Sequence, residues 1–313
     1  MTAAATLPPR DGSATIGALI DDYMAVYAGR DSSRTQRLGW WKARLGQVTL
    51  AELSDDQVFE ALESLAAQRG RFFVGLDADG RNIMKPKSAL RSPATINRYQ
   101  AALSAVLTWA QHQRIAPKNW QNPCRHVQLR AEHNQIVRYL SDAERVALLA
   151  ACKASTWPRL YVLALMALTT GARRGELEAL RWRDVDLDRA EASVHRSKNG
   201  DKKVLPLTPV VVEELRKIVG AAAALIFASK RRPEVAFNFD PAWDRALKAA
   251  GVKNFRWHDW RHTCASMLAQ NGATLHEVAE VLGHRQISVS RRYAHLATAH
   301  KTRLINRVLG DFR

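Results

Sequence analysis

Cysteine is scarce in this 313-residue sequence, and its three cysteines do not form any recognisable set. Cys124, Cys152 and Cys264 are odd in number, scattered along the chain, and form neither a CxxC pair nor a zinc-binding spacing. Cys152 and Cys264 fall in apolar helical patterns, which is typical of buried thiols. This usage argues against a disulfide framework and predicts a reducing, cytoplasmic compartment.

Long apolar runs are also missing. The longest, residues 160–168, is far too short to span a bilayer. The first fifteen residues contain two prolines and no apolar signal core. The expectation is a soluble, cytoplasmic protein with no membrane partner.

Several catalytic signatures are absent as well. The chain has no glycine-rich phosphate loop, no Ser-His-Asp order and no carboxylate cluster for magnesium. His258 and His262 have the four-residue spacing of some zinc helices, but the stretch lacks the glutamate of the protease motif and an obvious third ligand. We therefore predict a protein that uses no metal and no other cofactor.

Acidic residues are too few to balance the basic ones. The chain has 47 Lys and Arg against 30 Asp and Glu, for a formal net charge of +17. An excess of this size favours a polyanionic partner, because neutralising phosphates releases condensed counterions. Double-stranded DNA is the predicted partner; a merely basic soluble protein and a membrane-surface protein are the alternatives.

Hydrophobic spacing predicts a mainly α fold in two domains. Residues 1–12 are a polar flexible tail, and apolar residues at helical spacing make an N-terminal helical bundle of residues 13–116. Residues 117–138, which contain prolines, Asn and Gln, are the predicted linker. A mainly helical α+β domain follows over residues 139–313.

Two local signals shape the second domain. The capping box from Ser141 to Glu144 predicts its first helix. Residues 184–207 alternate in a strand-like way around Asn199-Gly200, which predicts a hairpin and hence a small antiparallel sheet.

One segment of the first domain breaks the helical pattern. Residues 70–90 contain Gly75, Gly80 and Pro86. Five basic residues fall in or beside the segment: Arg71, Arg81, Lys85, Lys87 and Arg91. We predict a mobile basic loop, which either contacts DNA or is ordinary solvated surface.

The second domain holds residues suited to phosphate chemistry without metal. His258 and Arg261 are three apart in a predicted helix and therefore share a face. Arginine binds phosphate oxygens through a planar fork and stays charged. The full set of candidates is Arg173, Lys198, His258, Arg261, His284 and Tyr293.

The segments that carry these residues resemble the boxes of the tyrosine recombinase, or phage integrase, family. The first box is Thr170-Gly171-Ala172-Arg173-Arg174-Gly175-Glu176-Leu177, and the lysine-bearing hairpin is Ser197-Lys198-Asn199-Gly200 followed by Val204-Leu205-Pro206-Leu207. The second box is His258-Asp259-Trp260-Arg261-His262-Thr263, and the closing segment is Leu282-Gly283-His284 with Tyr293-Ala294-His295. The first domain resembles the family's core-binding domain only in size, position and pattern.

The resemblance implies covalent phosphoryl transfer. Tyr293 would attack the scissile phosphate and leave a 3′-phosphotyrosine and a free 5′-hydroxyl. Arg173 and Arg261 would clamp the non-bridging oxygens. His258 would act in proton transfer, and His284 would hydrogen-bond the phosphate.

The general acid for the 5′-oxygen has three candidate lysines. The resemblance favours Lys198, with Lys202 and Lys203 as close competitors. Glu176 either orients an active-site residue or is a plain surface acid, and His262 has a structural or DNA-backbone role.

The same resemblance implies a site-specific recombinase that exchanges strands between two DNA sites as a homotetramer, with an accessory directionality factor as a further partner. The alternatives are relaxation of supercoils in the manner of a type IB topoisomerase, and DNA-binding regulation without catalysis.

Overall fold

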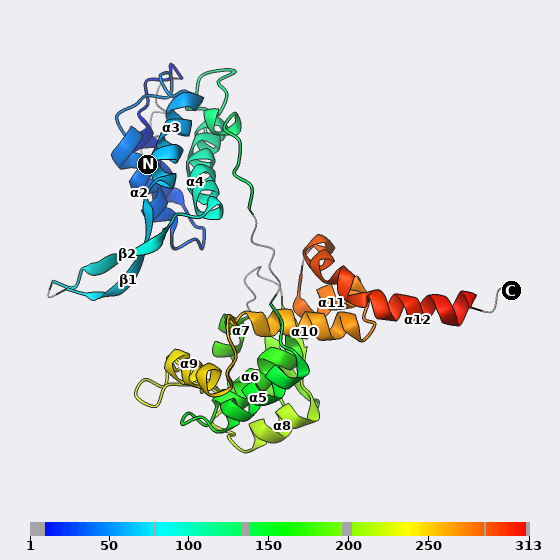
Figure 1. Ribbon diagram of the computed structural model, residues 1–313. Coiled ribbons are helices and arrows are strands. Elements are labelled where there is room, and N and C mark those ends of the chain that lie inside the picture. Colours follow the sequence, from blue (N-terminus) through cyan, green and yellow to red (C-terminus); the bar gives the residue numbers. More distant parts are fainter. Residues whose placement is uncertain (1–9, 78, 133–137, 196–201, 285, 311–313) are drawn as a thin grey trace, which may run out of the picture. The chain divides into compact units, whose positions relative to one another are not determined.

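The computed structural model describes residues 10–77, 79–132, 138–195, 202–284 and 286–310 (Figure 1). The chain divides into two compact units, residues 1–134 and 135–313. Both are mainly helical, and each described unit has a small antiparallel sheet, β1-β2 in the first and β3-β4-β5 in the second. The predicted fold class is confirmed.

The first unit consists of four helices, a two-stranded hairpin and a short 3-10 turn among its described residues. These elements are α1 (Ile16–Val26), α2 (Arg34–Leu45), α3 (Asp55–Ala66), β1 (Arg69–Leu76), β2 (Asn82–Leu90), α4 (Pro93–His112) and η1 (Pro123–Arg125).

Local capping sets the helix starts of this unit. Ser54 and Gln57 form a capping box at α3, and Ser92 caps α4 with Pro93 at the first helical position.

Trp41 is fully buried between the helices, and its indole donates a hydrogen bond to the carbonyl of Tyr99 at 2.8 Å. The buried indole thus keeps a polar partner while it fills the core.

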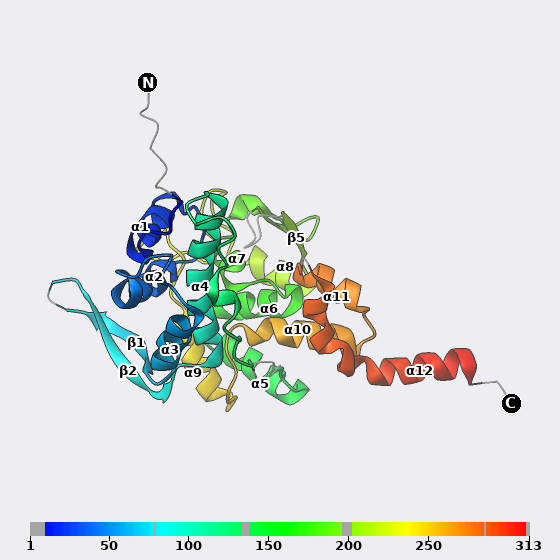
Figure 2. The same cartoon turned by 90° about the horizontal axis from the view of Figure 1, so that it is seen from above.

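The prediction of a loop over residues 70–90 was wrong. These residues form the antiparallel pair β1-β2, with Phe72 opposite Lys85 and Phe73 opposite Met84. Both faces of the hairpin are open to solvent, so it lacks the alternation of apolar and polar residues that marks a half-buried strand. Figures 1 and 2 show the hairpin projecting beyond the helices of its own unit.

Most of the segment predicted as a linker packs on the first unit. Gln100 of α4 donates to the carbonyls of Cys124 and Val127 at 2.9 and 2.7 Å. Trp120 donates to the carbonyl of Leu50 at 2.9 Å. These bonds satisfy the irregular backbone that composition alone marked as linker.

The second unit consists of helices and a small three-stranded sheet. Its described elements are α5 (Asp142–Lys153), α6 (Leu160–Thr170), α7 (Arg174–Glu178), η2 (Trp182–Asp184), β3 (Val185–Asp186), β4 (Glu191–Val194), β5 (Lys203–Pro206), α8 (Pro209–Arg216), α9 (Asp240–Ala249), α10 (Asp259–Gln270), α11 (Leu275–Leu282), η3 (Ile287–Ala297) and α12 (Thr298–Leu309).

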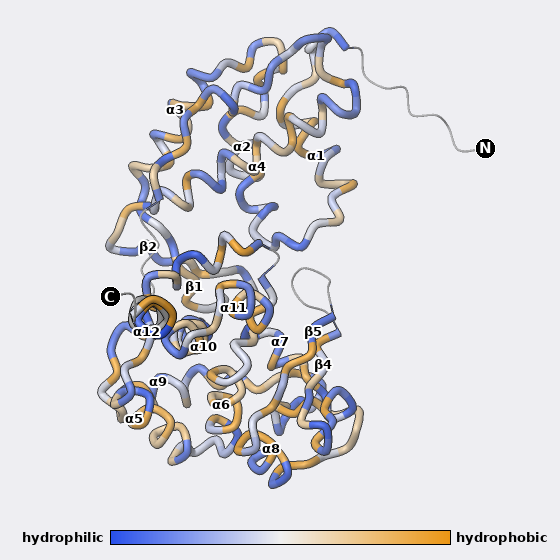
Figure 3. The backbone as a smooth tube through the Cα atoms, turned by 90° about the vertical axis from the view of Figure 1, so that its right-hand side faces the viewer, coloured by the Kyte–Doolittle hydropathy of each residue, from blue (hydrophilic) through white to orange (hydrophobic). Residues whose placement is uncertain are grey.

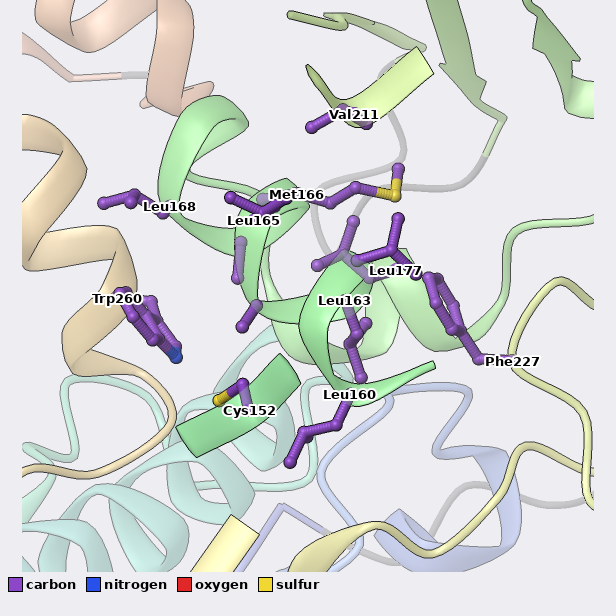
Figure 4. Close-up of a cluster of buried hydrophobic side chains, with 14 of the residues drawn as sticks. Cys152, Leu160, Leu163, Leu165, Met166, Leu168, Leu177, Val211, Phe227 and Trp260 are labelled. Carbon is purple, nitrogen blue, oxygen red and sulfur yellow. The ribbon is translucent and has the colours of Figure 1, made fainter. Parts of the chain in front are cut away.

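Helix α6 is the centre of the second unit's core. Nine of its eleven residues are buried, and Figure 4 shows Leu163 and Met166 among side chains from α5, α7 and α8. Trp260 of α10 lies on another side of the same cluster. Figure 3 shows apolar chain in orange around α6. A helix that is apolar on every side is buried in the core. The candidate site lies at the C-terminal end of α6.

Helix α12 extends away from the rest of its unit (Figures 1 and 2). Its side chains Ile305, Val308 and Leu309 are all more than half exposed. None of the helices in the described ranges has the length and apolar character needed to cross a bilayer.

Candidate active site

The site begins where α6 ends. Gly171 takes a left-handed conformation, with φ of 59°, and ends the helix. A Cβ at this position would come within 2.4 Å of the Leu282 side chain and 3.3 Å of Cys264 Sγ. Glycine is required here by both its backbone angle and its close contact with α10 and α11.

Arg173 is the N-cap residue directly before α7 and is held by a carboxylate three residues later. Its guanidinium pairs with Glu176 at 2.7 Å, and its backbone N–H donates to the other carboxylate oxygen at 3.0 Å. Glu176 is buried, so the pair fixes the arginine in a partly dehydrated setting. Glu176 is therefore a buried partner of Arg173 and not a plain surface acid.

Arg261 lies on the first turns of α10 and is only 4% exposed. Its Nη1 donates to the carbonyl of Gly171 at 2.7 Å, which ties the second box to the first. Burial, followed by the charge of Arg173, lowers the pKa of Arg261 to about 10. Among the described residues Arg261 forms no ion pair, and a buried cation in this state favours the binding of an anion.

Tyr293 lies on η3 and is only 1% exposed. Its hydroxyl and His262 Nδ1 are 2.6 Å apart, within hydrogen-bond distance. Burial raises the pKa of Tyr293 to about 12, against the opposing charges of Arg292 and Arg261. In the free protein the phenol is therefore neutral and held by a histidine.

His284 follows the left-handed Gly283 that ends α11. Its Nδ1 lies 2.8 Å from the hydroxyl of the fully buried Ser290. This bond orients the imidazole. Burial, then the charges of Arg261 and Arg173, lower the pKa of His284 to about 4.

Lys203, the first residue of β5, brings a third cation to the site. Its side chain lies against Gly283, and its buried Nζ has no hydrogen-bond partner in the described part of the chain. Burial lowers the pKa of Lys203 to about 8, opposed by Glu176 and aided by Arg261 and Arg173. A lysine in this range is suited to give up a proton near neutral pH.

The structure brings five of the six predicted residues to one place. Arg173, His258, Arg261, His284 and Tyr293 are close enough that Arg261 shifts the pKa of both histidines and of Tyr293. His258 is the N-cap residue directly before α10, and burial is the first cause that lowers its pKa. Lys198 falls in residues 196–201, outside the described part of the chain.

Two residues of the site were underestimated from the sequence. His262 contacts the Tyr293 hydroxyl directly, although the two are 31 residues apart. Lys203 was only a competitor of Lys198, yet its Nζ is the lysine nitrogen that the described residues place beside the arginines. Neither residue had a local signal, because its place depends on contacts between segments far apart in the chain: η3 packs on α10, and Lys203 of β5 lies against Gly283. In the described ranges no group of His, Cys, Asp or Glu is arranged to hold a metal.

The two depressed histidines predict a pH dependence of stability. Burial and then His258 lower the pKa of His262 to about 4, the same range as His284. In the unfolded chain both return to about 6.5. Between about pH 6.5 and pH 4 the unfolded chain therefore binds more protons than the folded chain. As a result, the free energy of unfolding falls as the pH drops below about 6.5 and levels off near pH 4.

We expect the thermal midpoint to fall between about pH 7 and pH 5, where carboxylates remain ionised. The His262→Asn and His284→Asn double variant flattens this dependence, whereas His276→Asn at an exposed position does not. Equal slopes in all three proteins would contradict the assignment. The measurement is a melting series followed by circular dichroism.

Comparison with known proteins identifies the class. Residues 138–300 match the sequence profile of the phage integrase family. The integrase of Salmonella phage P22 is 27% identical over 284 residues, covering 85% of this chain and 72% of the relative. The type 1 fimbriae regulatory protein FimE of Escherichia coli K12 is 31% identical over 167 residues, covering 50% of this chain and 84% of FimE.

Solved structures show the same fold. The Tn1549 transposon integrase in complex with a circular intermediate DNA has a TM-score of 0.72 at 17% identity, covering 95% of this chain and all of that one. The lambda integrase tetramer bound to a Holliday junction has a TM-score of 0.62 at 19% identity, covering 89% and 80%.

The profile match spans half of the chain, and FimE is matched over most of its length. The chain therefore belongs to the phage integrase family. It is an enzyme of the tyrosine recombinase class, which carries out site-specific DNA recombination. The chain spans 59% of the putative integrase of Pseudomonas phage Pf1 and 57% of the integrase of Haemophilus phage HP1.

Proposed function

We propose that Tyr293 is the nucleophile with which this recombinase cuts and later rejoins one strand of duplex DNA. One observation carries the proposal: the buried Tyr293 hydroxyl lies in a cluster with Arg173, Arg261 and Lys203. The positive charges of these three residues outnumber the single negative charge of Glu176 beside them. This excess of positive charge is suited to a phosphodiester and to the extra charge of its transition state.

The step exchanges one phosphorus–oxygen bond for another. Tyr293 Oη attacks phosphorus, the bond to the 5′-oxygen breaks, and a 3′-phosphotyrosine forms. The phenolic proton passes to a neutral histidine, with His258 assigned to proton transfer and His262 holding the hydroxyl beforehand. A returning 5′-hydroxyl reverses the step, so no cofactor is needed to reseal the strand.

The arginines and lysines have separate tasks in this scheme. Arg173 and Arg261 clamp the non-bridging oxygens, and His284 donates to one of them. A lysine protonates the departing 5′-oxygen. Lys198 is assigned by resemblance, and the burial of Lys203 Nζ beside the arginines makes Lys203 its rival.

Strand exchange requires two cut duplexes, and we propose a tetramer on DNA in the cytoplasm. The exposed apolar residues of α12, Ile305, Val308 and Leu309, offer a surface for a neighbouring protomer. The lambda integrase tetramer on a Holliday junction supports the same assembly for this chain. An accessory directionality factor is a further proposed partner.

The test is to capture the covalent complex. The protein is incubated with sheared DNA from the region around its gene and then denatured, and the DNA ends attached to protein are sequenced. We expect one recurrent sequence, with phosphate linked on the 3′ side. Attachment through 5′ ends, or no attachment by folded protein that binds the fragments, would contradict the proposal. The mass of the complex on the captured sequence gives the number of protomers.

A further inference from the structure

The β1-β2 hairpin carries charge that the proposed chemistry does not use. From Arg69 to Arg91 the sequence has six basic and two acidic residues. Arg71, Lys85 and Lys87 are exposed. The two acids, Asp77 and Asp79, lie at the tip, where Asp77 Oδ1 accepts from the backbone N–H groups of Asp79 and Arg81 at 3.0 and 2.8 Å. The charged residues along the sides of the hairpin are therefore all basic, and they alternate with exposed apolar residues such as Phe73 and Leu90.

A pocket of about 370 Å³ lies at the base of the hairpin. Four cations line it: Arg37 from α2, Arg71 and Lys87 from the hairpin, and Arg91 just before α4. No carboxylate is among its described lining residues, although Arg37 is paired with Asp31 nearby. The hydroxyls of Ser33 and Thr95 add further hydrogen-bonding groups.

Arg91 is the residue of this pocket whose guanidinium is most in need of a partner. It lies over the ring of Tyr99 with its guanidinium carbon 5.8 Å from the ring centre. Its Nε is buried and has no hydrogen-bond partner within the described residues. A dehydrated, unpaired guanidinium N–H costs free energy unless an anion completes it.

We propose that the hairpin and its basal pocket form a second DNA-backbone surface, in which the pocket seats one phosphate of duplex DNA and the hairpin follows the neighbouring phosphates. The inference rests on the proposed function for the choice of DNA as the polyanion. An eight-residue strand spans about 26 Å, and phosphates of one strand repeat every 3.4 Å or so. The hairpin is therefore long enough to reach several phosphates outside the reacting one.

The hairpin is poorly suited to pairing with a strand of another protein. Pro86 removes a donor from β2, and lysines flank it on both sides. Proline and lysine on an edge strand disfavour the addition of a further strand. Phosphate contact, in contrast, uses the same lysines directly.

The experiment compares two variants of equal charge in the full chain carrying Tyr293→Phe, so that only non-covalent binding is measured. The hairpin variant is Arg71→Gln/Lys85→Gln/Lys87→Gln. The control is Arg114→Gln/Lys118→Gln/Arg125→Gln, which changes three exposed residues elsewhere in the first unit. The probe is a fluorescent mixed-sequence duplex, titrated at a series of salt concentrations.

We expect the hairpin variant to weaken binding at least tenfold or so, and to reduce the slope of log affinity against log salt by about 0.9 for each lost phosphate contact. The control should change both by much less. Equal effects of the two variants, or no effect of either, would overturn the proposal. Intact DNA binding with a change in self-association would assign the hairpin to a protein partner instead and would also overturn it. Because the probe binds without covalent attachment, failure here is distinguishable from failure of the Tyr293 mechanism.

Discussion

The Tyr293→Phe variant is expected to form no covalent adduct with DNA. Phenylalanine keeps the ring that fills the buried site but removes the only atom that can bond to phosphorus. Loss of a nucleophile costs at least about 10⁴-fold in rate, which places the variant below detection. The measurement is the yield of protein-linked DNA ends under denaturing conditions, beside the wild-type chain.

The fold should survive this change. Tyr293→Phe loses one hydrogen bond to His262, worth about 1 kcal/mol. Non-covalent DNA binding is expected to stay close to that of the wild-type chain. The matched control is Tyr161→Phe on α6, a partly buried tyrosine outside the site, which should keep full adduct yield. Adducts in Tyr293→Phe, or their loss in Tyr161→Phe, would contradict the assignment of the nucleophile.

The second large effect is expected at Arg261. Arg261→Lys keeps a positive charge but removes the planar fork that donates to the Gly171 carbonyl and, in the proposal, to the phosphate. Removing one preorganised donor to a charged transition state costs about 10² to 10³ in rate. We expect a loss of this size in the rate of adduct formation.

Two comparisons show whether this loss is chemical. Non-covalent affinity for DNA should fall less than tenfold or so, because binding is shared among many cations. Arg256→Lys is the control, since Arg256 pairs with Asp259 three residues away but has an exposed side chain. A parallel loss of binding and rate, or an equal loss in Arg256→Lys, would indicate a structural role for Arg261.

The structure confirms that Cys152 and Cys264 are buried, as their apolar helical patterns predicted. Cys124, Cys152 and Cys264 are all free and buried, and burial raises the pKa of each thiol. Cys264 packs close to Gly171 and therefore lies beside the proposed site, although its sequence pattern marked it only as a core residue. A buried thiol of raised pKa is a poor nucleophile, so its role remains one of packing.

The sequence by itself determined the helical fold, the small sheet and the order of the chemical residues. Each depends on local rules. The side chains of Ser54, Ser141 and Thr274 cap their helices by accepting from backbone N–H groups three residues later, and Gly171 ends α6 through its own backbone angle. Chain order and spacing within a helix are also local, so His258 and Arg261 were expected on one face of α10.

Only the tertiary structure decided the contacts between distant segments. It placed the Tyr293 hydroxyl on His262 and Lys203 beside Arg173 and Arg261. It also placed Arg37 of α2 in the same pocket as Arg71 and Lys87 of the β1-β2 hairpin. No periodicity records such pairs, because they arise when separate elements share a core. The hairpin also escaped prediction because an element exposed on both faces has no apolar face to reveal it.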